Sequence, residues 1–134
     1  SHAGLSFESE LISKAGHILK KLHPKTEIVA IDEAQWFGED LIPIVETLLK
    51  KGKRVLVSGL ATTFDRQPFA PMPTLMSMAD KVNKLSAICI VCGNEAVYHK
   101  RITGDKKVSA LVADPSFVGR SDAYEARCRV CFEK

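Results

Sequence analysis

The sequence lacks any apolar run that approaches the roughly 20 residues needed to cross a lipid bilayer. Its first residues also lack the charged segment followed by an apolar segment that marks a secretory signal. The sequence also lacks a strong excess of one charge, since the formal net charge of +3 comes from dispersed lysines and arginines, densest at residues 50–54 and 106–107, with acidic residues between them. We therefore expect a cytoplasmic protein whose partners include neither a membrane nor a nucleic acid.

A glycine-rich phosphate-binding loop is a further absence. Gly4, Gly16, Gly38 and Gly52 are isolated glycines, and none is followed by Lys-Ser or Lys-Thr. In such a loop the backbone amides and the lysine hold the β- and γ-phosphates of a nucleotide. We find no other segment of the sequence that would take its place.

The composition is that of a soluble globular domain, with 46% hydrophobic and 26% charged residues in a chain of 134. We expect one domain with a small appendage. A subdomain of about 40 residues buries little apolar surface, so a bound metal would help it to remain folded.

Hydrophobic periodicity predicts alternating helices and strands in the first half of the chain. Apolar residues at helical spacing predict helices over residues 6–22 and 38–51, and short apolar runs predict strands over 27–31 and 54–60. Such runs are typical of strands covered on both faces in a parallel sheet. We expect an α/β fold in which a right-handed crossover joins the strands and helices lie on both faces of the sheet.

The next part of the chain holds a long predicted loop. Residues 61–73 contain three prolines and show no clear period, and we place them at the C-terminal edge of the sheet, where ligands bind in such folds. A short helix over residues 74–81 and a strand over residues 84–89 are expected to complete the α/β part.

The last part predicts a small β subdomain. Residues 95–101 and 107–113 alternate between apolar and polar, which predicts a β-hairpin with its turn at 103–105. We therefore divide the chain into an α/β core over residues 1–88 and a smaller subdomain over residues 89–134.

Four cysteines form two Cys-x-x-Cys knuckles, Cys89 with Cys92 and Cys128 with Cys131, and no other cysteine is present. Two residues between the cysteines let both thiolates of a knuckle bind one zinc ion, which takes four tetrahedral ligands. Four sulfur ligands leave no open coordination position, so we predict a structural zinc site. The alternatives are redox-active dithiols or unrelated buried cysteines, and residues 93–127 make a longer insert than most zinc ribbons have.

Two acidic residues follow the first predicted strand. Asp32 and Glu33 stand where P-loop ATPases, helicases among them, carry an acid that holds magnesium directly or through water. Adjacent residues at a strand end can face different directions, so one acid can serve the metal while the other accepts a proton. A solvated acidic strand end without catalytic function is the alternative.

Four motifs occur in order along the chain: residues 31–37 (IDEAQWF), residues 63–69 (TFDRQPF), the first knuckle, and residues 124–131 (YEARCRVC). In this order, over nearly the whole chain, they resemble the type II thymidine kinases. The resemblance implies a partial P-loop-type parallel sheet, a small zinc-ribbon β-hairpin subdomain, and a lasso loop that closes over the nucleoside.

The resemblance also implies a reaction, the ATP-dependent phosphorylation of thymidine at its 5′-hydroxyl in nucleotide salvage. Glu33 matches the general base of the family, and Asp32 and Gln35 match residues that bind the cofactors ATP and magnesium. The matching thymidine-binding residues are Trp36, Leu60, Phe64, Phe69, Phe117, Val118, Gly119 and Tyr124, of which the last four come from the lasso. Any of these could instead be an ordinary core residue, and Arg66, Lys100 and Arg101 could approach phosphates or simply be solvated cations.

By the same resemblance we expect a homotetramer with feedback inhibition by thymidine triphosphate. A phosphate-binding loop would precede this region, and the opening Ser1-His2-Ala3-Gly4 resembles an interior segment of these kinases. We therefore expect a fragment without kinase activity of its own. Two alternatives remain, a nucleic-acid-stimulated ATPase and a zinc-ribbon module that binds protein or nucleic acid.

The zinc site would connect the strand near Cys89 to the end of the lasso near Tyr124. We expect zinc removal to loosen the nucleoside lid before it disturbs Asp32 or Glu33.

Overall fold

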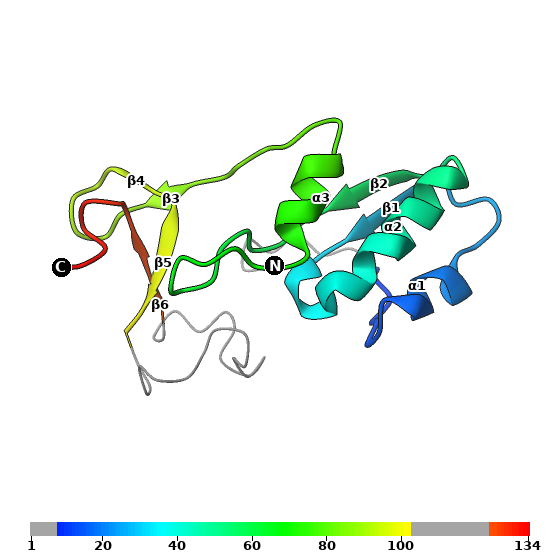
Figure 1. Ribbon diagram of the computed structural model, residues 1–134, viewed down its shortest axis with the longest axis horizontal. Helices are drawn as coiled ribbons and strands as arrows, with labels where there is room; N and C mark the ends of the chain where they lie inside the picture. The colour runs from blue at the N-terminus through cyan, green and yellow to red at the C-terminus, as the bar shows by residue number, and fades with distance from the viewer. Residues whose placement is uncertain (1–7, 103–123) are drawn as a thin grey trace.

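The computed structural model describes residues 8–102 and 124–134. Figure 1 shows α1, α2 and α3 gathered with β1 and β2 at one end of the molecule and β3 to β6 at the other. We call these parts the α/β region (residues 8–78) and the cysteine region (residues 87–102 and 124–134). An exposed connection without helix or strand, residues 79–86, joins them.

The α/β region contains three α-helices, one 3₁₀ helix and two strands among its described residues. In chain order they are α1 (Gly16–Lys21), β1 (Ile28–Ile31), the 3₁₀ helix η1 (Ala34–Asp40), α2 (Leu41–Lys50), β2 (Arg54–Val57) and α3 (Met72–Met78).

The two strands pair in parallel, as expected, with Ile28 opposite Arg54 and Ile31 opposite Val57. Val29, Ile31, Val55 and Val57 contact the helices, while Ile28 and Leu56 on the other face are 53% and 50% exposed. Among the described residues, helices therefore cover one face of this sheet, whereas we expected both. A short apolar run shows that a strand is hydrophobic, but not which of its faces will be covered.

The helix expected over residues 38–51 begins later, as α2 at Leu41, and residues 38–40 belong to the 3₁₀ helix η1. Gly38, with φ 60° and ψ −160°, separates a 3₁₀ turn from α2, and Pro43 lies in the first turn of α2, where its missing N–H is not needed. At the other end Gly52 has φ 70°, and the N–H groups of Gly52 and Lys53 donate to the carbonyls of Leu49 and Leu48. This is a Schellman termination, which requires a left-handed residue at Gly52.

Helix α1 is shorter than expected. Of the described part of the helix predicted over residues 6–22, residues 8–15 are not helical. Ile12 nevertheless packs against the core. A periodic apolar residue can thus reach the core without a helix.

One hydrophobic cluster holds the α/β region together. Its buried members come from α1, β1, η1, α2, α3 and the residue before α1: Ala15, Ile18, Ile31, Ala34, Leu41, Val45, Leu48, Met72 and Leu75. The cluster lies on the helix-covered face of β1 and β2.

The loop after β2 folds back on itself. Strand β2 ends at Val57, earlier than the expected residue 60, and Thr62 forms an isolated antiparallel bridge with Pro68. The Phe69 N–H donates to the Ala61 carbonyl at 3.0 Å. Helix α3 then begins at Met72, two residues before the expected start.

The cysteine region consists of two antiparallel strand pairs. They are β3 (Ala87–Ile88) with β4 (Glu95–Ala96), and β5 (Tyr98–Arg101) with β6 (Tyr124–Arg127). The strand expected over residues 84–89 therefore pairs within this region and does not extend the parallel sheet. The expected partner of residues 95–101, residues 107–113, and the turn at 103–105 lie outside the described residues. Alternation indicates a strand, but its partner depends on contacts distant in sequence.

Within the described ranges, no helix has the length and apolar character to cross a membrane.

Candidate functional site

The four cysteines come together at the end of the cysteine region. The sulfur atoms of Cys89, Cys92, Cys128 and Cys131 all lie within 4.8 Å of one another, and those of Cys92 and Cys128 are 3.6 Å apart. A tetrahedral zinc site with metal–sulfur bonds of about 2.3 Å has sulfur–sulfur edges of about 3.8 Å. Three of the residues are buried and Cys92 is exposed. The cluster therefore fits one zinc ion.

Backbone hydrogen bonds shape the first knuckle. The Cys89 N–H donates to the Asn94 carbonyl at 2.8 Å, and the Gly93 N–H donates to the Cys89 carbonyl at 2.9 Å. Gly93 has φ 74°, a conformation that favours glycine. The Ile90 N–H donates to the Ala126 carbonyl at 3.2 Å, which ties the knuckle to β6 and so to the second cysteine pair.

The environment of the thiols differs between the cysteines. A backbone hydrogen bond from Cys128 lowers the pKa of Cys89 to about 6, and one from Cys131 lowers the pKa of Cys128. Burial raises the pKa of Cys131 to about 12. Backbone donors therefore favour two thiolates, while burial opposes a third charge unless a cation neutralises it. All four thiols are free, and a single cluster of four suits a metal better than two redox pairs.

Asp32 lies just after β1, at the C-terminal edge of the parallel sheet. Its Oδ1 accepts a hydrogen bond from the Glu33 N–H at 2.9 Å and another from the Ser58 hydroxyl. Ser58 follows β2, and its N–H donates to the Ile31 carbonyl at 2.9 Å. The exposed Asp32 carboxylate is thus held between the ends of both strands.

Glu33 adopts a left-handed backbone conformation, with φ 54° and ψ 42°. A non-glycine residue in this region is uncommon and needs support from its surroundings. Support comes from Gln35, whose Nε2 donates to the Glu33 carboxylate and whose Oε1 accepts from the Leu60 N–H at 3.0 Å. Gln35 is 4% exposed. Its amide therefore connects Glu33 to the segment after β2, while a contact with a cofactor stays a prediction.

Gly59 is a site residue that the sequence analysis missed. A Cβ atom there would lie 2.7 Å from the Gln35 Oε1 and 3.0 Å from the Met72 sulfur. Only a residue without a side chain lets this segment pass so close to Gln35. The signal available in the sequence was a glycine inside the strand expected over residues 54–60, which often marks a close backbone approach.

The expected thymidine-binding residues within the described ranges form two aromatic pairs. Trp36 meets Phe69 edge to face, with centroids 6.2 Å apart, and Phe64 lies 6.4 Å from Tyr124. The first pair belongs to the α/β region, whereas the second joins the loop after β2 to β6. Leu60 is 40% exposed. The remaining expected residues, Phe117, Val118 and Gly119, lie outside the described residues.

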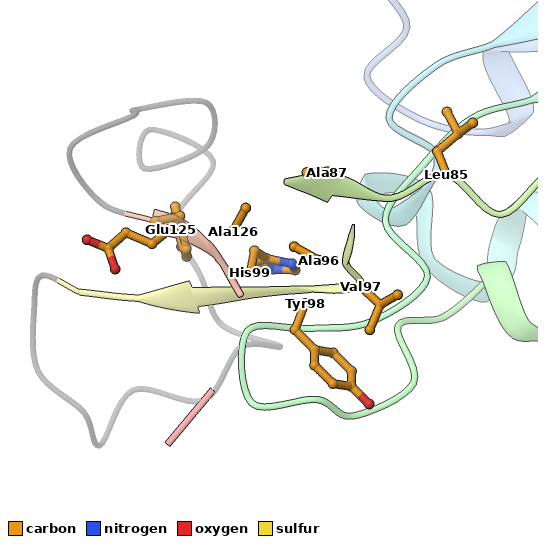
Figure 2. A pocket seen from close by; sticks show the side chains of 9 residues that line it. Leu85, Ala87, Ala96, Val97, Tyr98, His99, Glu125 and Ala126 are labelled. Carbon is orange, nitrogen blue, oxygen red and sulfur yellow. The ribbon is translucent and has the colours of Figure 1, made fainter. Parts of the chain in front are cut away.

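A groove of about 240 Å³ lies along the strands of the cysteine region. Figure 2 shows Tyr98 and His99 leaving β5 on opposite sides, with Ala87 on the neighbouring strand β3 and Leu85 before it. His99 also meets the Tyr124 ring, at 5.7 Å between centroids, and burial lowers its pKa. Asp32 and Glu33 do not line this groove, whereas Tyr124 does.

The thymidine kinase family model matches residues 1–132. The chain belongs to the thymidine kinase family. The resemblance read from the four motifs is thereby confirmed, and membership indicates a thymidine kinase-related function, that of a phosphotransferase. The described parallel sheet has two strands, so the partial P-loop-type sheet stays a prediction.

Proposed function

We propose that the chain forms the nucleoside-side part of a thymidine kinase, which transfers the γ-phosphoryl group of ATP to the 5′-hydroxyl of thymidine in nucleotide salvage. The observation that carries the proposal is the pair of acids at the end of β1. Asp32 and Glu33 are adjacent, yet different partners hold their carboxylates, Ser58 for one and Gln35 for the other. Two fixed carboxylates can serve two roles in one reaction.

In this proposal Asp32 faces the nucleotide and Glu33 faces the nucleoside. Magnesium bound with ATP would neutralise charge on the phosphates. The Ser58 hydroxyl and the Glu33 N–H keep the Asp32 carboxylate at the sheet edge where it would bind that ion. The Glu33 carboxylate, held by Gln35, would accept the proton of the 5′-hydroxyl as it attacks.

The aromatic pairs would form the walls around the pyrimidine. Trp36 with Phe69, and Phe64 with Tyr124, offer flat apolar surfaces of the kind on which a base stacks. Leu60 and residues Phe117, Val118 and Gly119 complete the proposed pocket. Feedback by thymidine triphosphate and a homotetrameric, cytoplasmic enzyme also remain proposals that rest on the family resemblance.

Zinc would act as a structural ion. The four sulfurs would fill its coordination sphere, so it would join the turn after β3 to the end of β6 and leave no position for substrate. The division into residues 1–88 and 89–134 is proposed on the same basis, although the pairing of β3 with β4 places Ala87 and Ile88 beside the second part.

Ligand-induced stabilisation tests the nucleoside assignment. Thymidine at 100 times its dissociation constant should stabilise the chain by about 2.7 kcal/mol, seen as a higher melting temperature. Deoxyguanosine carries the same sugar with a larger base and serves as the control, for which we expect no shift. Salt-sensitive oligonucleotide binding together with no response to thymidine would contradict the proposal and favour a nucleic-acid-binding module.

Substitution of Glu33 tests the catalytic assignment. In a form of the protein that carries a phosphate-binding loop, Glu33→Gln should lower turnover by at least about 10²-fold, because the base is lost. Thymidine binding should be nearly unchanged. Glu39→Gln, the same change at an exposed position of η1, is the matched control. Near-normal turnover of Glu33→Gln would remove Glu33 from the base role.

A further inference from the structure

The loop after β2 contacts the cysteine region through Arg66. The Arg66 Nη2 lies 3.0 Å from the Glu133 carboxylate, and the guanidinium carbon lies 4.5 Å from the centre of the Phe132 ring. Phe132 and Glu133 directly follow the ligand candidate Cys131. One side chain of the loop therefore rests on the two residues next to the metal site.

A tight turn places Arg66 in this position. The Thr63 N–H donates to the Gln67 carbonyl at 2.9 Å, and the Gln67 N–H donates to the Thr63 hydroxyl at 3.0 Å. Thr63 is 2% exposed, so the turn is anchored in the protein. Within it Arg66 has φ 66°, a conformation rarely adopted by residues with a side chain. Such a conformation persists where surrounding contacts hold it.

The ring under Arg66 is itself fixed beside the cysteines. Phe132 is 8% exposed and meets Tyr98 of β5 edge to face, with centroids 5.6 Å apart. Its position therefore depends on the fold of the cysteine region, which the metal would stabilise.

The same loop makes a second contact with this region. Phe64 lies 6.4 Å from Tyr124, and the Arg101 guanidinium carbon lies 5.4 Å from the centre of the Phe64 ring. The loop also carries Phe69, which meets Trp36 in the α/β region. Arg66 thus contacts the residues next to the metal site and belongs to the loop that supplies one ring to each aromatic pair of the proposed nucleoside pocket.

We propose that Arg66 is a positioning residue that couples the zinc site to the aromatic walls of the nucleoside pocket. It holds the loop of residues 61–70 against Phe132, and through that loop it orients Phe64 and Phe69. In this role Arg66 contacts neither phosphate nor substrate. The effect on thymidine rests on the proposed function, whereas the coupling between zinc and the loop does not.

Thymidine affinity gives the first test. Arg66→Ala should weaken thymidine binding by about 5- to 10-fold, because it removes a cation–π contact and an ion pair. Arg66→Lys keeps the charge and should stay within about threefold of the parent chain. Glu133→Gln removes only an exposed ion pair and should change affinity by less than about twofold. Arg54→Ala, an exposed arginine at the start of β2, is the matched control and should have no effect.

Trp36 gives the second test, one that does not depend on activity. It is the single tryptophan of the chain and it contacts Phe69, so its emission reports the position of the loop. Removing zinc with a chelator should shift Trp36 emission in the parent chain. The Arg66→Ala variant should keep its zinc and show part of that shift before any chelator is added. Its Trp36 emission should then change less than that of the parent chain when zinc is removed.

The outcomes separate the two proposals. If the parent chain does not bind thymidine, the proposed function fails, and the Trp36 comparison still decides the coupling. If the parent chain and Arg66→Ala respond equally to zinc removal, the coupling through Arg66 is wrong. Weaker thymidine binding by Arg66→Ala with an unaltered Trp36 response would also overturn it, because the effect would then be a direct contact with the ligand.

Discussion

The two regions of the molecule are stabilised by different means. The α/β region buries nine residues in one hydrophobic cluster, whereas the corresponding cluster in the cysteine region consists of three cysteines and Ala96. A part this small buries little apolar surface, and metal–sulfur bonds can replace a core because their binding energy is gained on folding. The comparison teaches that one change can unfold one region and leave the other intact.

Loss of a metal ligand should give the largest difference in stability between the two regions. In Cys131→Ser we expect the cysteine region to lose zinc and its backbone order, because structural zinc contributes about 10–16 kcal/mol in small zinc domains. Metal analysis should fall from about one zinc per chain, and the amides of Cys89 and Gly93 should lose protection from hydrogen exchange. Amides of α2 should keep theirs.

Val130→Ala is the control for this experiment, since it changes the same knuckle at a residue that is 78% exposed and leaves all four thiols. Retention of zinc and unaltered exchange in Cys131→Ser would contradict the structural role of the metal.

A cavity in the hydrophobic cluster should give the converse result. Leu48 is fully buried in α2, and Leu48→Ala should lower the free energy of unfolding of the α/β region by about 2–5 kcal/mol. Denaturant titration followed by Trp36 fluorescence measures this change, and zinc content should be unaffected. The neighbouring Leu49 is 46% exposed, so Leu49→Ala should cost clearly less. Equal losses from both variants would argue against the helix face assigned to the core.

A methyl group at Gly59 should have a smaller effect at the junction of β2 and Gln35. Gly59→Ala would bring a Cβ within 2.7 Å of the Gln35 Oε1, and crowding of this kind costs about 1–3 kcal/mol. We expect lower stability and weaker thymidine binding, measured by denaturant titration and calorimetry. Gly16→Ala introduces the same methyl group where nothing lies within 4 Å, and it should be neutral or slightly stabilising. A neutral Gly59→Ala would show that the Gln35 bridge is dispensable.

The smallest predicted effect is a pH dependence confined to the cysteine region. Burial lowers the pKa of His99 below its usual 6.5, so the folded state resists a proton that the unfolded state accepts. The contribution of His99 to stability is therefore complete above pH 6.5 and declines as the pH falls below it. An NMR titration of the zinc-loaded protein should place the pKa of His99 below 6.5. The His99→Gln variant should lack this contribution to the dependence of stability on pH. A pKa at or above 6.5 would refute the prediction.

Elements with strong local signals were predictable. The parallel pair β1 and β2 and the helix between them follow from apolar runs and helical spacing, and Gly52 marks the end of α2 as expected. Residues 8–15 are not helical although their apolar residues have helical spacing. The spacing is misleading because Ile12 can pack against the core without a helix. The strand near residue 88 pairs with β4 and not with the parallel sheet as expected, because an apolar run does not specify the partner of a strand.

The site was predictable where residue type and spacing carry the chemistry. The cysteines come together as expected, and Asp32 lies at the strand end. The bridge through Gln35, the requirement for Gly59 and the contact of Arg66 with Phe132 were not foreseen. Each of these joins segments that are far apart along the chain, and no local pattern records such a contact.

The sequence by itself determined the family of the chain, its four candidate metal ligands and the acids that follow β1, because ligand chemistry and strand ends depend on residue type and short spacing. The tertiary structure alone decided which sheet face the helices cover, which strands pair beside the cysteines, and how the loop of residues 61–70 meets Phe132. The physical reason is that these features depend on close packing between distant segments. Packing is set by the shape of the folded chain.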